Sequence, residues 1–154
     1  MKLTSTAFQN DELIPQKYGQ DFEDINPPLT IQDIPEGTKS LALLMDDPDI
    51  PESAGIPVWD HWVVFNISPA IMEIKENWNV KGIRGKGTRG YLNYSGPKPP
   101  DREHRYFFKL YALDNTLNLA EGATKIDVER AMEGHVLEHA VLMGRYAPST
   151  KIRT

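Results

Sequence analysis

Residues 95–106, which read SGPKPPDREHRY, lead from a loop into an aromatic strand, and they decide how this chain folds. The prolines exclude a helix here, because proline lacks a backbone N–H and fixes its own φ. The aromatic and aliphatic run at 105–113 then predicts a strand. Residues two apart in a strand point to the same face, so His104 and Tyr106 are expected to lie on one face. The loop therefore delivers a histidine and a tyrosine together where a strand begins.

The rest of the chain reads as one mainly β domain that spans residues 1–154. A chain of 154 residues is long enough for a single domain with a sizeable core. Its 12 prolines and 11 glycines lie mainly in the first two thirds and separate short apolar runs, which is typical of an all-β region. The clearest runs are residues 40–45, 62–67 and 105–113. The first is apolar almost throughout, as expected for a strand buried on both faces.

One helix is expected near the end of the chain. Residues 124–127 resemble a capping box with aspartate in place of glutamate. Apolar and histidine side chains then recur at helical spacing as far as His139, although Gly134 weakens the middle of the segment. Residues 141–146 read as a closing strand, and the charged tail after Pro148 is expected to be frayed.

Composition and charge exclude several classes of function. The net charge of −5 disfavours binding to nucleic acid or to a membrane surface, which both call for basic faces. No apolar run approaches the ~18 residues of a membrane helix, and the N-terminus lacks the apolar core of a signal peptide. The chain has no cysteine, which fits a reducing compartment. We therefore expect a cytoplasmic protein without stable membrane insertion.

Polar residues stand at the ends of three predicted strands. Asp47 follows the strand at 40–45, whereas His61 and His104 begin the other two. If the first strand is antiparallel to both neighbours, these ends lie at one edge of one sheet. Each residue alone is an ordinary polar residue at a strand end, but Asp47, His61, His104 and Tyr106 together favour a binding site.

Strand alternation assigns these side chains to faces. It predicts that His61 shares a face with Val63 and Phe65. It also predicts that Arg105 points away from its neighbours in the site. We therefore assign Arg105 to a structural ion pair, with Asp49 as the expected partner.

The motifs, taken in order, resemble the phosphatidylethanolamine-binding protein family, and in particular its bacterial and archaeal Raf-kinase-inhibitor-like group. The matching segments are DPDIP at 47–51, WDHWVV at 59–64, GPKPP at 96–100, HRY at 104–106 and AMEGHVL at 131–137. The segments occur in order, and the resemblance covers nearly the whole chain. The resemblance implies antiparallel sheets packed as a sandwich, with a short C-terminal helical segment. It also makes a homodimer a modest expectation.

The same resemblance implies a pocket for small anions, including phosphate-type head groups, at a sheet edge. Carried over by position, the ligand-binding residues are Asp47, Pro51, Trp59, His61, Gly96, Pro97, His104 and Tyr106. Two histidines could replace the Lys or Arg usual for phosphate, because a charged imidazole donates two hydrogen bonds. Asp47 would orient one imidazole and favour its protonated form. Backbone N–H groups around Gly96 and the hydroxyl of Tyr106 would supply further donors.

The sequence departs from the family pattern at the mouth of this pocket. Lys98 lengthens the turn at Gly96, and residues 101–103 replace the usual glycine-containing approach to the histidine. Residues 26–28, Asn-Pro-Pro, stand where the group usually has Ser-Pro. These departures affect the mouth of the pocket more than its floor.

Residues 135–139, HVLEH, match a zinc-protease pattern. On a helix, His135 and His139 would share one face. A catalytic zinc needs a third protein ligand, which relatives with this motif take from a carboxylate far downstream. Only fifteen residues follow His139. We therefore favour a helix packed on the sheet and expect no metal and no cofactor.

Two other patterns are weaker still. Residues 85–90 match Gly-x-Gly-x-x-Gly, but no helix is expected after them, so we interpret them as a mobile basic loop near the pocket. Residues 46–49 are acidic but lack the ligand spacing of a calcium-binding EF-hand. A proline-restricted turn with one functional aspartate is preferred.

Three functions follow from this pattern. The preferred one is a non-enzymatic binding module for a small anion that carries a phosphate or carboxylate group. The second is a protein–protein regulator, such as a protease or kinase inhibitor with an unknown target. The third is a small hydrolase that uses the Asp, His and Tyr residues, although Ser95 is the nearest nucleophile and has no evident paired base.

Overall fold

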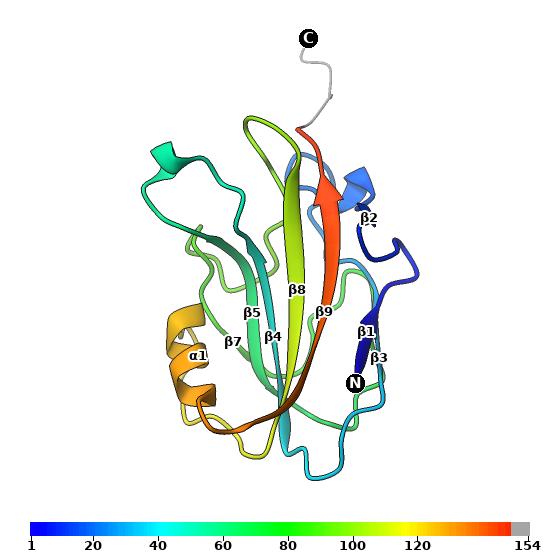
Figure 1. Cartoon of the computed structure of the whole chain (residues 1–154), viewed down its shortest axis with the longest axis vertical. Helices are drawn as coiled ribbons and strands as arrows, with labels where there is room; N and C mark the ends of the chain where they lie inside the picture. The colour runs from blue at the N-terminus through cyan, green and yellow to red at the C-terminus, as the bar shows by residue number, and fades with distance from the viewer. Residues whose placement is uncertain (149–154) are drawn as a thin grey trace.

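The computed structural model describes residues 1–148 as two β-sheets and one helix (Figure 1). The small sheet has the order β1 (Lys2–Thr4), β3 (Leu29–Gln32), β6 (Glu73–Ile74). The large sheet has the order β2 (Glu12–Leu13), β9 (Val136–Tyr146), β8 (His104–Leu113), β4 (Ser40–Asp47), β5 (Trp59–Ile67), β7 (Ile83–Arg84). Two 3-10 turns, Gln16–Tyr18 and Glu52–Ala54, and helix α1 (Lys125–Met132) complete the elements. The tail predicted to be frayed lies outside the described residues.

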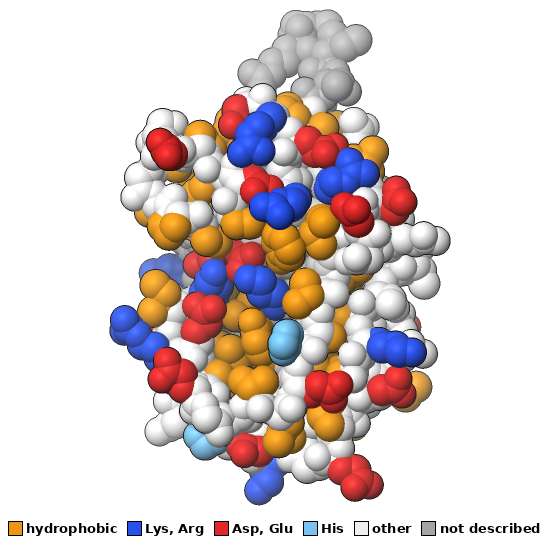
Figure 2. Space-filling model, viewed as in Figure 1, with side chains coloured by type: hydrophobic (Ala, Val, Ile, Leu, Met, Phe, Trp, Pro, Cys, Tyr) orange, Lys and Arg blue, Asp and Glu red, His pale blue; other side chains and the backbone are white. Residues whose placement is uncertain are grey.

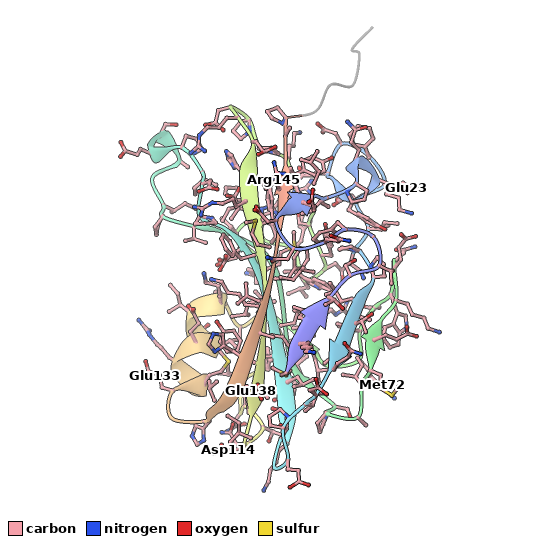
Figure 3. All side chains as sticks on the ribbon, turned by 45° about the vertical axis from the view of Figure 1, so that its right-hand side comes forward. Glu23, Met72, Asp114, Glu133, Glu138 and Arg145 are labelled. Atoms are coloured by element: carbon pink, nitrogen blue, oxygen red, sulfur yellow. The ribbon has the colours of Figure 1, made fainter. Side chains whose placement is uncertain are left out.

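The mainly β sandwich is confirmed, and strand β4 runs through its centre. All eight residues of β4 are buried, and β4 pairs antiparallel with both β5 and β8. One face of β4 packs into the core between the two sheets, and its other face packs into a second cluster that includes residues of α1. The pairing of β2 with β9 is parallel, whereas the other strand pairs are antiparallel. The N-terminal ammonium of Met1, beside β1, lies 2.5 Å from Glu138 of β9, which is labelled in Figure 3.

Helix α1 begins as predicted but ends earlier. Thr124 and Asp127 form the capping box, each side chain accepting a hydrogen bond from the backbone N–H of the other residue. The helix stops at Met132, because Gly134 adopts a left-handed φ of 78° and the chain then enters β9. Within residues 1–148, no helix is long and apolar enough to cross a membrane.

The prediction that His135 and His139 share a helical face was therefore wrong. His135 lies in the turn after α1 and its Nδ1 is 2.8 Å from Asp114. His139 lies in β9, opposite Tyr111 of β8, and the two rings stack with centroids 6.0 Å apart. The closing strand is also longer than predicted, since it begins at Val136. Its pairing with β8 outweighs the helical spacing of the side chains.

A bulge in β5 changes the face on which His61 lies. Trp62 pairs with Met45 of β4, but the next residue of β4 pairs with Asp60, so His61 is an extra residue in the ladder. Val63 and Phe65 pack in the cluster with α1, whereas His61 lies 5.2 Å from the ring of Tyr106, which belongs to the core between the sheets. The predicted grouping of His61 with Val63 and Phe65 was wrong, because a bulge shifts the alternation by one residue.

A buried ion cluster fixes α1 on the outer face of the large sheet. Asp46 is 2% exposed and its Oδ2 accepts hydrogen bonds from Lys109 at 2.9 Å and Lys125 at 3.0 Å. Lys125 Nζ also lies 3.4 Å from Asp60. Figure 2 shows basic and acidic side chains interspersed with hydrophobic ones on this face. The side chain of Asp46 therefore lies on the face of the sheet that carries α1, whereas that of its neighbour Asp47 lies on the opposite face.

Candidate functional site

The ends of β4, β5 and β8 meet at one edge of the large sheet, as predicted. They frame a pocket of about 410 Å³. The pocket is lined by Gln20, Asp47, Ile50, Pro51, Ala54, Trp59, His61, Arg89, Lys98, Pro99, Pro100, His104 and Tyr106. Six of the eight predicted ligand-binding residues therefore line a single cavity; the exceptions are Gly96 and Pro97.

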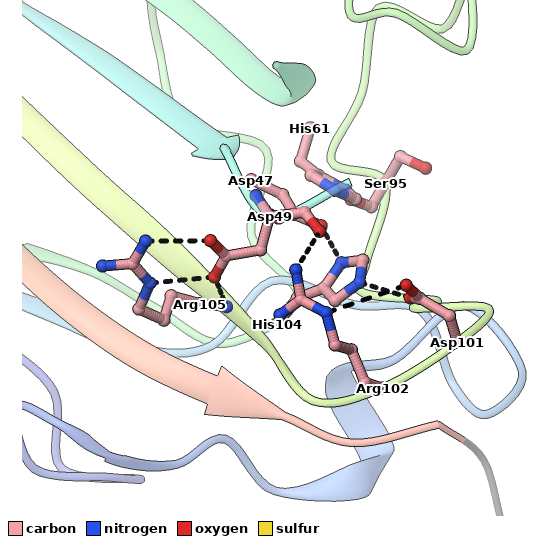
Figure 4. Close-up of polar contacts among 8 residues, drawn as sticks. All are labelled: Asp47, Asp49, His61, Ser95, Asp101, Arg102, His104 and Arg105. Atoms are coloured by element: carbon pink, nitrogen blue, oxygen red, sulfur yellow. Dashed lines mark hydrogen bonds and ion pairs between the residues drawn. The ribbon is translucent and has the colours of Figure 1, made fainter. Parts of the chain in front are cut away.

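His104 is held between two carboxylates (Figure 4). Its Nδ1 lies 2.6 Å from Oδ2 of Asp47, and its Nε2 lies 2.7 Å from Oδ1 of Asp101. An ionised carboxylate only accepts hydrogen bonds, so both ring nitrogens carry a hydrogen when both aspartates are ionised. The side chain of His104 is fully buried. The expectation that Asp47 orients an imidazole is confirmed.

Asp47 also holds the chain that leaves β4. Its Oδ1 accepts a hydrogen bond of 2.8 Å from the backbone N–H of Asp49, which closes the turn after the strand. Burial, together with the negative charge of Asp47, raises the pKa of Tyr106 well above its ordinary value. Tyr106 therefore keeps its phenolic hydrogen throughout the neutral range.

His61 is fixed in one tautomer by the backbone. Its Nδ1 lies 2.7 Å from the carbonyl oxygen of Ser95, and because a carbonyl can only accept, Nδ1 carries the hydrogen. His61 is only 4% exposed, and this burial lowers the pKa of its imidazole, so the ring is neutral. Nε2 then has a free lone pair, and no residue within 1–148 bonds to it. His61 therefore offers a ligand an acceptor.

Arg105 forms the predicted ion pair with Asp49. Its Nε and Nη2 each lie 2.8 Å from a different oxygen of the carboxylate, and its backbone N–H donates to the same group at 2.9 Å. The Arg105 side chain holds the pKa of Asp49 at about 2. This pair ties the start of β8 to the turn after β4, so it positions His104 beside Asp47.

Comparison with known proteins agrees with this architecture. The model of the family "Phosphatidylethanolamine-binding protein" matches residues 4–147. This chain belongs to that family.

Relatives and solved structures cover almost the same length. A UPF0098 protein of Methanothermobacter thermautotrophicus is 47% identical over an alignment of 152 residues that covers 95% of this chain and 98% of the relative. A UPF0098 protein of Chlamydia muridarum is 45% identical over 147 residues, with the same shares covered. A Chlamydia trachomatis protein, described as a phosphatidylethanolamine-binding protein homolog, has a crystal structure that matches with a TM-score of 0.93 and 42% identity over 96% of this chain and 97% of its own. Escherichia coli YbcL, described as a member of the mammalian family, matches with a TM-score of 0.87 at 24% identity over 96% and 98%, and supports the fold alone.

Gly96 and Pro97, the two predicted ligand-binding residues that do not line the pocket, lie behind its wall. The backbone N–H of Gly96 donates to Oδ1 of Asp24 at 2.7 Å, so it is already bonded and does not face a ligand. A Cβ on Gly96 would lie 2.1 Å from the carbonyl oxygen of Tyr18. The carbonyl of Pro97 accepts a hydrogen bond of 2.9 Å from the backbone of Gln20. Glycine is needed here for the approach of another backbone segment, rather than for the approach of a ligand.

Two cationic residues of the lining were not expected as ligand contacts. Arg89 comes from the glycine-rich basic loop at 85–90, and its guanidinium lies 4.2 Å from the ring of Tyr91. Lys98 comes from the proline-rich loop, with its Nζ 3.3 Å from Asp21. The basic character of residues 85–90 was the only sequence signal for Arg89, because no local pattern shows that this loop folds close to β8. The contact between Asp101 and His104 was also missed.

Proposed function

We propose that this member of the phosphatidylethanolamine-binding protein family is a non-enzymatic binding protein for a small organic oxyanion. The observation that carries the proposal is the pocket itself, which combines buried His61, His104 and Tyr106 with Arg89 and Lys98. The chain has a net charge of −5, yet two cations line this one cavity, which favours an anionic ligand there. Each cation also lies near a carboxylate, Arg89 3.9 Å from Asp24 and Lys98 3.3 Å from Asp21.

The lining also suits the carbon part of such a ligand. Apolar side chains form much of the wall, among them Ile50 and Pro51 from the segment that joins β4 to β5, Trp59 at the start of β5, and Pro99 from the loop before β8. Ligand sites of this kind combine apolar walls with a few placed polar groups. The ligand is therefore an oxyanion attached to a small non-polar or weakly polar group.

The position of Ser95 supports binding rather than hydrolysis. His61 approaches the backbone carbonyl of Ser95, whereas the hydroxyl oxygen of Ser95 lies 3.3 Å from Gln20 Nε2 and 3.4 Å from Arg89 Nη1. A serine nucleophile needs a base within hydrogen-bond reach of its hydroxyl. The contacts of Ser95 thus favour a structural role for this residue.

Calorimetric titration with inorganic phosphate tests the proposal. His61→Ala and His104→Ala are each expected to weaken phosphate binding at least tenfold, because each removes a polar group of the floor. His139→Ala is the matched control, since that histidine lies on the other face of the sheet and should leave the affinity unchanged.

Removing His104 leaves Asp47 buried without its partner, so circular dichroism must show that each variant is folded. Arg89→Gln provides a third pocket variant, at an exposed position, and is expected to weaken binding about threefold. Equal phosphate affinity in the wild type and all three pocket variants would refute the proposal.

A further inference from the structure

Asp101 already accepts the hydrogen bond that an anionic ligand would need from the pocket. Of the two histidines in the pocket, His61 presents a lone pair, so His104 Nε2 is the imidazole N–H that could donate to an anion. Asp101 Oδ1 lies 2.7 Å from that nitrogen (Figure 4). Pro99 and Pro100, which directly precede Asp101, line the pocket. A carboxylate of the protein itself therefore stands where an oxyanion would bind.

The two carboxylates on His104 differ in how firmly they are held. The side chain of Asp47 is 3% exposed and is also bonded to the backbone of Asp49. The side chain of Asp101 is 39% exposed and lies in the loop before β8. Its other oxygen lies 3.8 Å from Arg102, whose side chain is 61% exposed. Asp101 can turn into water beside Arg102 without becoming a buried, unpaired charge, whereas Asp47 cannot.

We propose that Asp101 is an internal competitor for the anion site and makes the pocket selective for phosphate-type oxyanions over simple carboxylates. This inference rests on the proposed function. A tethered group acts at an effective concentration in the millimolar range, so a free monocarboxylate gains nothing by replacing it. A phosphate dianion carries more charge and a third oxygen, so it can contact His104 and the cations Arg89 and Lys98 together. Only the second kind of ligand displaces Asp101.

Asp101 is ionised when it competes. The hydrogen bond from His104 lowers the pKa of the Asp101 carboxyl below its ordinary value. At neutral pH the competitor is therefore fully charged.

The test compares inorganic phosphate and acetate as probes in calorimetric titrations of the wild type, Asp101→Ala and Glu103→Gln. Glu103→Gln is the matched control, because Glu103 lies in the same loop, carries the same charge and contacts Arg145 instead of His104. Asp101→Ala is expected to strengthen acetate binding at least tenfold and phosphate binding about threefold. Glu103→Gln is expected to change either affinity less than twofold. The ¹⁵N chemical shift of His104 Nε2, measured without added anion, should change in Asp101→Ala only.

Each outcome bears on a different claim. If the wild type binds phosphate but Asp101→Ala binds phosphate and acetate no more tightly, the internal competitor is refuted and the anion site stands. Equal gains in Asp101→Ala and Glu103→Gln would refute it too, since the effect would then be one of general charge. If neither the wild type nor Asp101→Ala binds phosphate, the proposed function itself is refuted.

Discussion

His61 shows how a single backbone contact decides what a side chain can offer. The carbonyl of Ser95 takes the hydrogen of Nδ1, and burial keeps the ring neutral. A histidine that looks from the sequence like a donor for an anion is therefore an acceptor. It would bond to a hydroxyl of a ligand, including the P–OH of a protonated phosphate, rather than to a bare oxyanion.

The lowered pKa of His61 predicts a pH dependence of stability. In the unfolded chain its pKa is about 6.5. Between the folded and the unfolded pKa, the unfolded state binds more protons, so the free energy of unfolding rises with pH in that window. The contribution of neutral His61 is thus fully present above about pH 6.5 and is lost as the pH falls below it. Urea denaturation at several pH values from about 7.5 down to 5 measures this slope.

The matched variant is His61→Asn, which keeps a donor for the Ser95 carbonyl but does not titrate. It is expected to be less stable than the wild type at neutral pH and to lose less stability on acidification. His139→Ala, on the outer sheet face, should keep the slope of the wild type. The same slope in all three proteins would show that His61 does not titrate as its burial demands.

At the scale of elements, sequence patterns predicted those features that depend on residues close together in the chain. The apolar runs indicated β4, β5 and β8, and the capping box marked the start of α1. The convergence of Asp47, His61 and His104 followed from antiparallel pairing alone. The bulge at His61 could not be predicted, because a period of two in the sequence does not reveal an extra residue. The early end of α1 follows from the left-handed φ of Gly134 together with the pairing of β9 with β8, and that pairing is a non-local contact.

The capping box gives a prediction for the stability of α1. Thr124→Ala removes the side chain that accepts from the backbone N–H of Asp127 and is expected to lower the free energy of unfolding by about 1 kcal/mol. Thermal or urea denaturation measures the loss. Thr116→Ala changes an exposed threonine in a loop and should alter stability by less than about 0.5 kcal/mol. Equal losses in the two variants would mean that the cap does not stabilise the helix.

At the scale of the whole molecule, the pocket depends on a segment far from it in sequence. Residues 18–24 pack behind the loop at 95–97, where Gly96 meets the carbonyl of Tyr18 and the carboxylate of Asp24. Burial raises the pKa of Asp24 more than the N–H of Gly96 and the charge of Arg89 lower it. Such a contact between distant segments leaves no periodic signal in the sequence, where only the family resemblance, by position, singled out Gly96.

Gly96→Ala is therefore predicted to destabilise the fold and not merely the site. Its Cβ would lie 2.1 Å from a backbone oxygen, which cannot move aside as a side chain can. We expect a loss of about 2–3 kcal/mol in the free energy of unfolding, typical of overpacking. Gly122→Ala is the comparison, because its added Cβ has open space and only the left-handed φ of 93° opposes it. That variant should lose about 1–2 kcal/mol, and a larger loss there than at Gly96 would contradict the packing argument.

The bulge in β5 also gives the protein its own optical reporter. It leaves Trp59 half-buried in the pocket wall while Trp62, on the other side of His61, is buried and stacks on Tyr94 with ring centroids 5.4 Å apart. Trp78 is 40% exposed and lies outside this pocket. Replacing Trp62 and Trp78 by phenylalanine would leave Trp59, at the edge of the cavity, as the single tryptophan. The emission of this tryptophan, excited selectively over the six tyrosines, would then follow the filling of the pocket directly, in solution and without a label.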